Sequence, residues 1–201
     1  AENAARAMPT SAYRIRGFVR EHILADRPHA SLWLAKTHVI PAGMYASQVW
    51  GTGFMQAGKE FSSALQTLHL NFLKGTLGVK RTTTNWAVLR ECGHQPLQYY
   101  WFRAAVKLYN SMLGTNSSTL RRVMQADLKL QPKDDKCWTA QLIQAFQGLR
   151  GSEIFEQAVR SGGAISMNDF SADLRYRLQG VWREAESVDP RENNNKLATY
   201  Q

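Results

Sequence analysis

Chemistry in this chain would have to come from a few Cys, His and Asp residues. Cys92 and His94 are separated by a single residue, Gly93, and Cys137 is the only other thiol. A structural zinc site needs four ligands at short local spacing, and no CxxC or HxxxH pattern accompanies this pair. A nucleophilic Cys/His pair also needs a group that orients the base, and no such Asn or Asp can be identified. We therefore interpret Cys92 as a helix-end residue and His94 as a loop residue, so the sequence predicts no metal site.

Adjacent aspartates occur once, at Asp134 and Asp135. Carboxylates hold the metal ions of two-metal phosphoryl-transfer enzymes, but this pair follows Lys133 in the polar stretch QPKDDK, which is typical of a solvated linker. The other histidines are scattered along the chain: His22, His29, His38 and His69. The sequence contains no Walker loop and no GxGxxG motif. It therefore predicts no catalytic residue and no cofactor.

Positive charge is the strongest functional signal. The chain carries 25 Lys and Arg against 16 Asp and Glu, a formal net charge of +9. Residues 61–130 contribute nine basic and two acidic residues, whereas residues 131–201 contribute nine and ten. A local excess of this kind favours a phosphate-facing surface. A solvated basic face without a partner is the alternative.

Apolar residues at helical spacing predict the elements that would carry this charge. Pro9 is expected to end a first helix over residues 2–8, and Pro41 to kink or divide the helix that begins at Ser31, because proline removes a backbone donor. Gly75 and Gly78 are expected to end a helix over residues 59–74. Thr84 is expected to cap the next helix. With no internal repeat and no period-two strand pattern, the sequence predicts an all-α, multi-helix bundle of about eight helices in two subdomains.

The segment 96–113 has the most informative pattern. At 100° per residue it forms two neighbouring apolar faces, one through Leu97 and Trp101 and one through Phe102 and Val106. The remaining arc carries basic and aromatic residues: Tyr99, Tyr100, Arg103, Lys107 and Asn110. We expect this helix to pack on two sides and to present a basic, aromatic stripe on the third.

Composition bounds the class of protein. A chain of 201 residues with 44% hydrophobic residues can bury a real core, which excludes wholesale disorder. No apolar run approaches the ~20 residues that a membrane helix needs. Two cysteines far apart in sequence favour a reduced, intracellular setting. The chain begins without Met and already in a helical pattern, so we interpret it as a fragment or excised domain.

Residues 39–97 resemble a known family. The segment VIPAGMYASQVWG resembles the region just after the polymerase palm in LINE-type (non-LTR) retrotransposon reverse transcriptases, with Pro41, Tyr45 and Trp50 at the family's spacing. The family commonly has Gly and Glu where this chain has Ala46 and Gln48. A second family pattern follows downstream and is matched by Leu77, Gly78, Thr82 to Thr84, Leu89, Glu91, Gly93, Pro96 and Leu97. These motifs are structural, and the resemblance covers about the first two-thirds of the chain.

The resemblance implies the thumb and post-thumb helical region of a retrotransposon polyprotein. On this reading the chain comprises post-palm connecting helices (1–58), a basic thumb-like region (59–130), a C-terminal helical subdomain (131–188) and a tail (189–201). The palm signature Tyr-x-Asp-Asp is missing, because Ser47 and Gln48 follow Tyr45 and Ala46. The fragment is therefore not expected to polymerise by itself.

A thumb grips a template–primer duplex through its backbone, and phosphate contacts position a duplex without reading bases. The expected contacts are Lys74, Lys80, Arg81, Thr82, Thr83, Arg90, Tyr99, Arg103 and Lys107, with Tyr100 as a second stacking candidate. The implied partners are RNA or an RNA–DNA hybrid duplex and the missing polymerase palm, with no membrane. The implied location is the nucleus or cytoplasm, within a ribonucleoprotein. The alternative is a helical protein–protein interaction module that does not bind nucleic acid.

Overall fold

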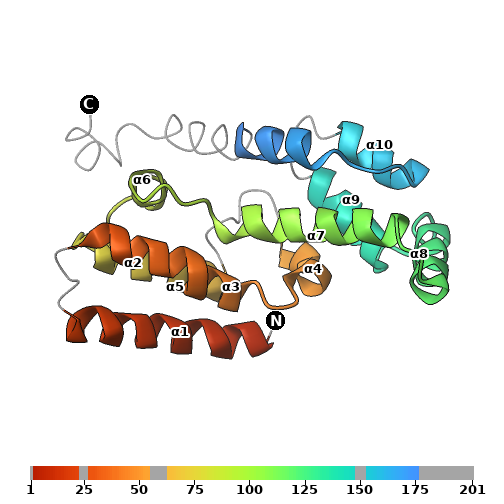
Figure 1. The fold of residues 1–201 in the computed structure, drawn as a ribbon. Helices are drawn as coiled ribbons and strands as arrows, with labels where there is room; N and C mark the ends of the chain where they lie inside the picture. Colours follow the sequence, from red (N-terminus) through yellow and green to blue (C-terminus); the bar gives the residue numbers. More distant parts are fainter. Residues whose placement is uncertain (1, 23–26, 55–62, 148–152, 177–201) are drawn as a thin grey trace. The chain divides into compact units, whose positions relative to one another are not determined.

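The computed structural model describes residues 2–22, 27–54, 63–147 and 153–176, and these residues form helices joined by turns, without β-strands (Figure 1). The α-helices are α1 (Glu2–Glu21), α2 (Pro28–Leu34), α3 (Ile40–Gly43), α4 (Ser47–Trp50), α5 (Ala64–Thr76), α6 (Asn85–Glu91), α7 (Leu97–Leu113), α8 (Ser118–Leu130), α9 (Trp138–Gln147) and α10 (Glu153–Ser161). Residues 167–176 are also helical. The all-α prediction is confirmed, although the described part of the chain has ten labelled α-helices rather than about eight.

The described residues divide into two compact units. Unit 1 comprises residues 46–54, 98–147 and 153–176, and unit 2 comprises residues 2–22, 27–45 and 63–97. This grouping differs from the consecutive ranges that the sequence suggests, because segments distant in sequence share a core. In unit 2, α1 packs on α5, and in unit 1 the 3-10 turn Gly51–Phe54 packs on α9. Residues 59–62, at the start of the helix expected over 59–74, and residues 177–201, including the expected tail, lie outside the described residues.

Unit 2 is built on one face of α1. Met8, Ala12 and Ile15 recur at spacings of four and three and are buried, so they form the helix stripe that faces the core. This stripe runs across Pro9, which lies inside α1. The prediction that the first helix ends near Pro9 is therefore wrong. Burial of the residues on both sides of Pro9 stabilises the helix through the proline, whose own side chain is exposed.

The interruption expected at Pro41 takes the form of a change in helix type. Between α2 and α3 the chain forms a π-helical segment, Ala35–Val39, and Pro41 lies in the first turn of α3. A proline lacks the N–H that an α-helix requires, and a π-helical turn is one of the recognised ways to accommodate such a defect. Gly43 at the end of α3 allows α1 to approach closely, since a Cβ there would meet Met8 Sδ at 2.6 Å.

The connector between α5 and α6 begins with a defined helix end. Gly75 does not break α5, which continues to Thr76, so the chain turns only at Gly78, with φ of 68°. The N–H of Val79 donates to Lys74 O at 3.0 Å, which is the outer hydrogen bond of a Schellman motif. Thr84 occupies the N-cap position of α6 as expected, but its side chain makes no capping hydrogen bond.

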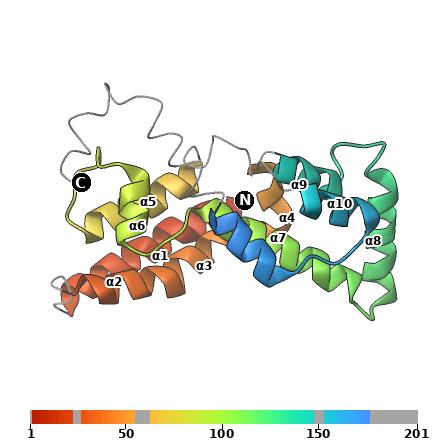
Figure 2. The ribbon, with the colours of Figure 1, turned by 90° about the horizontal axis from the view of Figure 1, so that it is seen from above.

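Unit 1 is built around α7. Both predicted apolar faces of this helix are buried, including Trp101, Phe102 and Val106. Phe102 lies within an aromatic cluster whose members come from α9, α10 and the helical residues 167–176: Phe146, Phe155 and Phe170. Figure 2 shows these elements gathered along α7.

Among the described residues no helix is long and apolar enough to cross a membrane.

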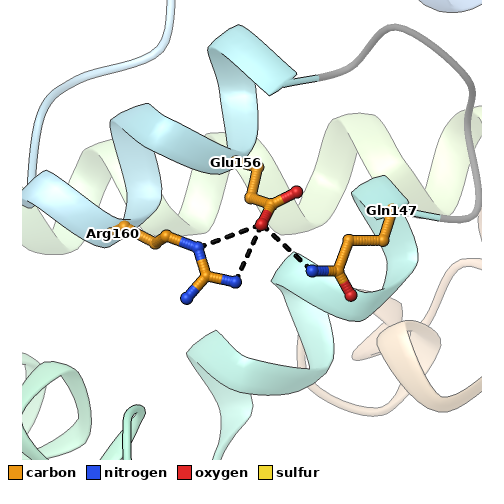
Figure 3. Close-up of polar contacts among 3 residues, drawn as sticks. All are labelled: Gln147, Glu156 and Arg160. Carbon is orange, nitrogen blue, oxygen red and sulfur yellow. Dashed lines mark hydrogen bonds and ion pairs between the residues drawn. The ribbon is translucent and has the colours of Figure 1, made fainter.

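Polar contacts join the helices of unit 1 at their ends. The Asp127 carboxylate on α8 accepts hydrogen bonds from the N–H groups of Trp138 (3.2 Å) and Thr139 (2.8 Å), which caps α9. Glu156 on α10 accepts from Gln147 Nε2 at 3.0 Å and from both Nε and Nη2 of Arg160 (Figure 3). Carboxylates at helix starts offset the orphan N–H groups there. These contacts fix α8, α9 and α10 around the aromatic cluster.

Candidate nucleic-acid interface

The connector between α5 and α6 presents its basic residues on a tight turn. The N–H of Thr83 donates to Lys80 O at 3.0 Å and closes the turn. Lys80, Arg81 and Thr82 are exposed on it, and Thr83 is half-buried. Among the described residues, no carboxylate pairs with the side chain of Lys80 or Arg81. The turn therefore offers two unpaired cations and one exposed hydroxyl to a ligand.

Lys74 supports this turn from inside the protein. Its Nζ donates to Arg81 O and to Asn85 Oδ1, both at 2.7 Å, and the residue is 6% exposed. Burial lowers the pKa of Lys74. The sequence predicts Lys74 as a phosphate contact, but its ammonium group is already occupied by acceptors of the connector and α6. We therefore assign Lys74 a positioning role and leave it out of the interface.

A hollow of about 770 Å³ opens between α1, α5 and the connector. Two guanidinium groups line it, Arg81 from the connector and Arg16 from α1. Arg16 Nη2 donates to Asn71 O at 3.0 Å, and its guanidinium lies over the Phe72 ring, 5.4 Å from the centroid. Tyr13, which is 80% exposed, lines the same hollow. Cations and an exposed ring around an apolar floor can take a phosphate together with a sugar or base.

Sequence reasoning missed the contribution of α1. Arg14 and Arg16 stand on its polar positions, but helical spacing does not reveal which other element they face. Arg14 lines a second hollow of about 520 Å³ together with Arg6 and His38. Across the described ranges of unit 2, ten Lys and Arg stand against three Asp and Glu. The charge expected of the connector is thus shared with α1 and with Arg90, which is exposed on α6.

The remaining predicted contacts belong to unit 1. Arg103 and Lys107 are exposed on α7, one turn apart. Tyr99, by contrast, is only 2% exposed, and its ring lies 5.4 Å from that of Tyr100. A ring buried in this way cannot stack on a base, so we remove Tyr99 from the stacking candidates. The third face of α7 is therefore basic at its surface and aromatic beneath it.

The structure thus divides the predicted set between the two units. Unit 2 brings the residues of the connector together on one turn, with one more cation on α6: Lys80, Arg81, Thr82, Thr83 and Arg90. Unit 1 carries Arg103 and Lys107 on α7. Each unit therefore presents its own basic surface.

Two of the histidines considered for chemistry, His69 and His94, form a buried pair in unit 2. His69 Nε2 lies 3.1 Å from His94 Nδ1, and both residues are buried. Burial lowers the pKa of His69 to about 3, with the nearby His94 adding to the effect. Burial and the nearby Lys36 lower the pKa of His94 to about 4. Both rings are therefore neutral at pH 7.

The Cys92 thiol is also unreactive in this environment. Burial, with a smaller contribution from Glu91, raises its pKa to about 11. The thiol therefore stays protonated at neutral pH and is a poor nucleophile and a poor metal ligand. Within the described ranges no three Cys, His, Asp or Glu side chains gather as metal ligands. Asp134 accepts a hydrogen bond from the N–H of Lys136 at 2.9 Å, and Asp135 is exposed beside it.

Comparison of the chain with protein-family models, with curated proteins and with solved structures gave no match.

Proposed function

We propose that this chain is the non-catalytic helical portion of a non-LTR retrotransposon reverse transcriptase, and that it grips the template–primer duplex through phosphate contacts. The observation that carries this proposal is the turn at Lys80 to Thr83. It holds two exposed cations without carboxylate partners among the described residues, and the internal hydrogen bonds of Lys74 fix its backbone. A cationic turn held in one conformation loses little entropy when it binds a phosphate strand.

The composition of the two basic surfaces supports phosphate contact rather than base reading. Their exposed groups are ammonium and guanidinium ions, joined in unit 2 by the Thr82 hydroxyl, and these groups suit phosphate and sugar oxygens. Asn and Gln side chains, which pair with adenine edges, are not among the expected contacts. The proposed partners are an RNA–DNA hybrid or RNA duplex and the polymerase palm of the same polyprotein.

A triple variant tests the proposal. Changing Arg81, Arg103 and Lys107 together to Ala removes cations from both units, and hybrid affinity should fall by at least tenfold at moderate salt. The slope of log K against log salt concentration should shrink by about 3 in magnitude, since each lost phosphate contact removes roughly 0.9. The measurement is fluorescence anisotropy of a labelled RNA–DNA hybrid over a salt series.

The chain provides a control with the same loss of charge. Arg121, Arg122 and Lys129 are all exposed on α8, and none of them is among the expected contacts. Their triple Ala variant should retain the affinity and salt slope of the wild-type chain much more fully. Equal losses in the two triple variants would mean that net charge alone drives binding, which would contradict the assigned surface.

A helical interaction module remains the second candidate, and one observation favours it. Leu120, Val123 and Leu130 on α8 are 47%, 55% and 50% exposed, and they follow one another at spacings that place them on the same side of the helix. An exposed apolar stripe of this kind suits a protein partner. Hybrid binding that is absent or insensitive to salt would favour this function over the first.

A further inference from the structure

Tyr99 of α7 is in contact with two arginines, one of them from a segment far along the chain. The helical residues 167–176 lie along the first turns of α7 in both views (Figures 1 and 2). From this segment, Arg175 Nε donates to the Tyr99 hydroxyl oxygen at 2.9 Å. The guanidinium carbons of Arg103 and Arg175 lie 5.7 and 5.5 Å from the centroid of the Tyr99 ring. One buried tyrosine thus positions two exposed arginines.

These two guanidinium groups have unused hydrogen-bonding capacity. Arg103 makes no hydrogen bond to any described residue, and Arg175 uses only its Nε. Neither arginine forms an ion pair with a carboxylate in the described part of the chain. Arg160 of the same unit shows the contrast, because Glu156 neutralises it (Figure 3). Two like charges on one ring repel each other, so an anion between or beside them would be bound favourably.

We propose that Arg103 and Arg175 form a two-arginine clamp for the phosphodiester backbone of a bound nucleic-acid strand, and that Tyr99 holds the clamp in place. This proposal rests on the proposed function and adds to it a contact from the C-terminal part of the chain. Lys107, one turn further along α7, extends the clamp. The helix at residues 167–176 therefore takes part in gripping the strand.

The geometry suits this ligand. The two distances to the ring limit the separation of the guanidinium carbons to about 11 Å. Phosphates on one strand follow each other by about 3.4 Å along the duplex axis, so the arginines reach the same phosphate or phosphates a few steps apart. The planar guanidinium donates two parallel hydrogen bonds to phosphate oxygens. Because Tyr99 is 2% exposed, its ring is held rigidly and supports both arginine side chains.

Four single variants test the clamp by hybrid binding over a salt series. Arg103→Gln and Arg175→Gln should each weaken affinity by roughly tenfold and reduce the magnitude of the salt slope by about 1. Tyr99→Phe removes only the hydroxyl that accepts the hydrogen bond from Arg175 Nε. Hybrid affinity should therefore fall about threefold, while the salt slope stays unchanged. Arg121→Gln on α8 is the control with equal loss of charge, and it should bind like the wild-type chain. A Tyr99→Phe variant with wild-type affinity, or an Arg121→Gln variant as weak as Arg175→Gln, would overturn the clamp.

A second measurement separates the clamp from the wider function. In the full chain with 15N-labelled arginine, a dinucleoside monophosphate should shift the Nε–H signals of Arg103 and Arg175 together, and less so in Tyr99→Phe. Inorganic phosphate in a parallel titration distinguishes a free phosphate site, which would bind it as well as or better than the diester. If hybrid binding fails but both signals shift with the diester, the clamp stands and the proposed function fails. If the hybrid binds and neither signal shifts, the clamp is overturned while the proposed function stands.

Discussion

Acidification should destabilise unit 2 through its buried histidine pair. His69 and His94 are 0% and 2% exposed, and their folded-state pKa values are about 3 and about 4, against 6.5 for a free histidine. The unfolded chain therefore binds protons more readily than the folded one below pH 6.5. The stability that the neutral pair contributes is complete above pH 6.5 and is lost as the pH falls toward the folded-state values.

The size of this effect follows from the two shifts. Each pKa unit corresponds to about 1.4 kcal/mol, so two histidines lose roughly 4 kcal/mol between pH 6.5 and about pH 5. This is a large part of the ~5–15 kcal/mol that stabilises a typical domain. The assay is urea denaturation followed by circular dichroism at a series of pH values. His22, which is exposed in the turn directly after α1, provides the control variant His22→Gln.

The double variant His69→Gln, His94→Gln isolates the pair. Its unfolding free energy should depend on pH less steeply than that of the wild-type chain between pH 6.5 and 5, whereas His22→Gln should follow the wild-type curve. If the double variant does not fold, the imidazole C–H signals of the wild-type chain give the same information by NMR titration. Two results would refute the reasoning: identical pH dependence of the unfolding free energy in the wild-type chain and the double variant, or His69 and His94 imidazole signals that titrate near pH 6.5.

Three further predictions concern stability. Gly43→Ala should lower the unfolding free energy by about 1–3 kcal/mol, because the new methyl group would lie 2.6 Å from Met8 Sδ and force the side chain to repack; thermal denaturation measures the loss, and an unchanged Tm would contradict the close approach. Asn110→Ala should cost about 1–3 kcal/mol, because the amide donates to Ile165 O at 2.6 Å and accepts from Ile165 N at 3.0 Å, and both backbone groups would lose their partner; faster amide hydrogen exchange at Ile165 is the specific readout. Ser63→Ala should cost about 1 kcal/mol by removing the α5 cap hydrogen bond, and it is tested by urea denaturation, with Ser63→Asn expected to restore most of the loss.

The sequence predicts the helices well where apolar spacing decides them. Both apolar faces of α7 follow from residue type alone, because a helix that buries one face must repeat its apolar residues every three or four positions. Helix α5 departs from this rule, since Gln66, His69 and Lys74 are buried there beside Leu70, Phe72 and Leu73. Sequence reasoning fails at Pro9, which is a local signal for a break, but burial on either side carries α1 through it. At Pro41 the expected division of the helix is present, and the π-helical segment before it is the detail that the sequence does not predict. Local propensity is a weak guide when tertiary packing opposes it.

The candidate interface shows the same limit. Exposed Lys80 and Arg81 can be read from the sequence, since a run of cations beside Gly and Thr favours a surface turn. Burial of Lys74 and Tyr99 cannot, because their polar atoms find partners only after other elements pack against theirs; for Lys74 these are the connector and α6. For Tyr99 that partner is Arg175, 76 residues away in sequence. Pairing between elements with large sequence separation is not contained in the periodicity of either element.

The salt dependence of binding to an RNA–DNA hybrid tests the central claim most directly. If Lys80, Arg81, Arg90, Arg103 and Lys107 contact phosphates, log K should fall linearly with log salt concentration with a slope of about −4.5. Affinity should also be the same for hybrids of unrelated sequence, because phosphate contacts carry no base information. A slope near zero, or no binding at low salt, would contradict the claim that this chain grips nucleic acid through its backbone.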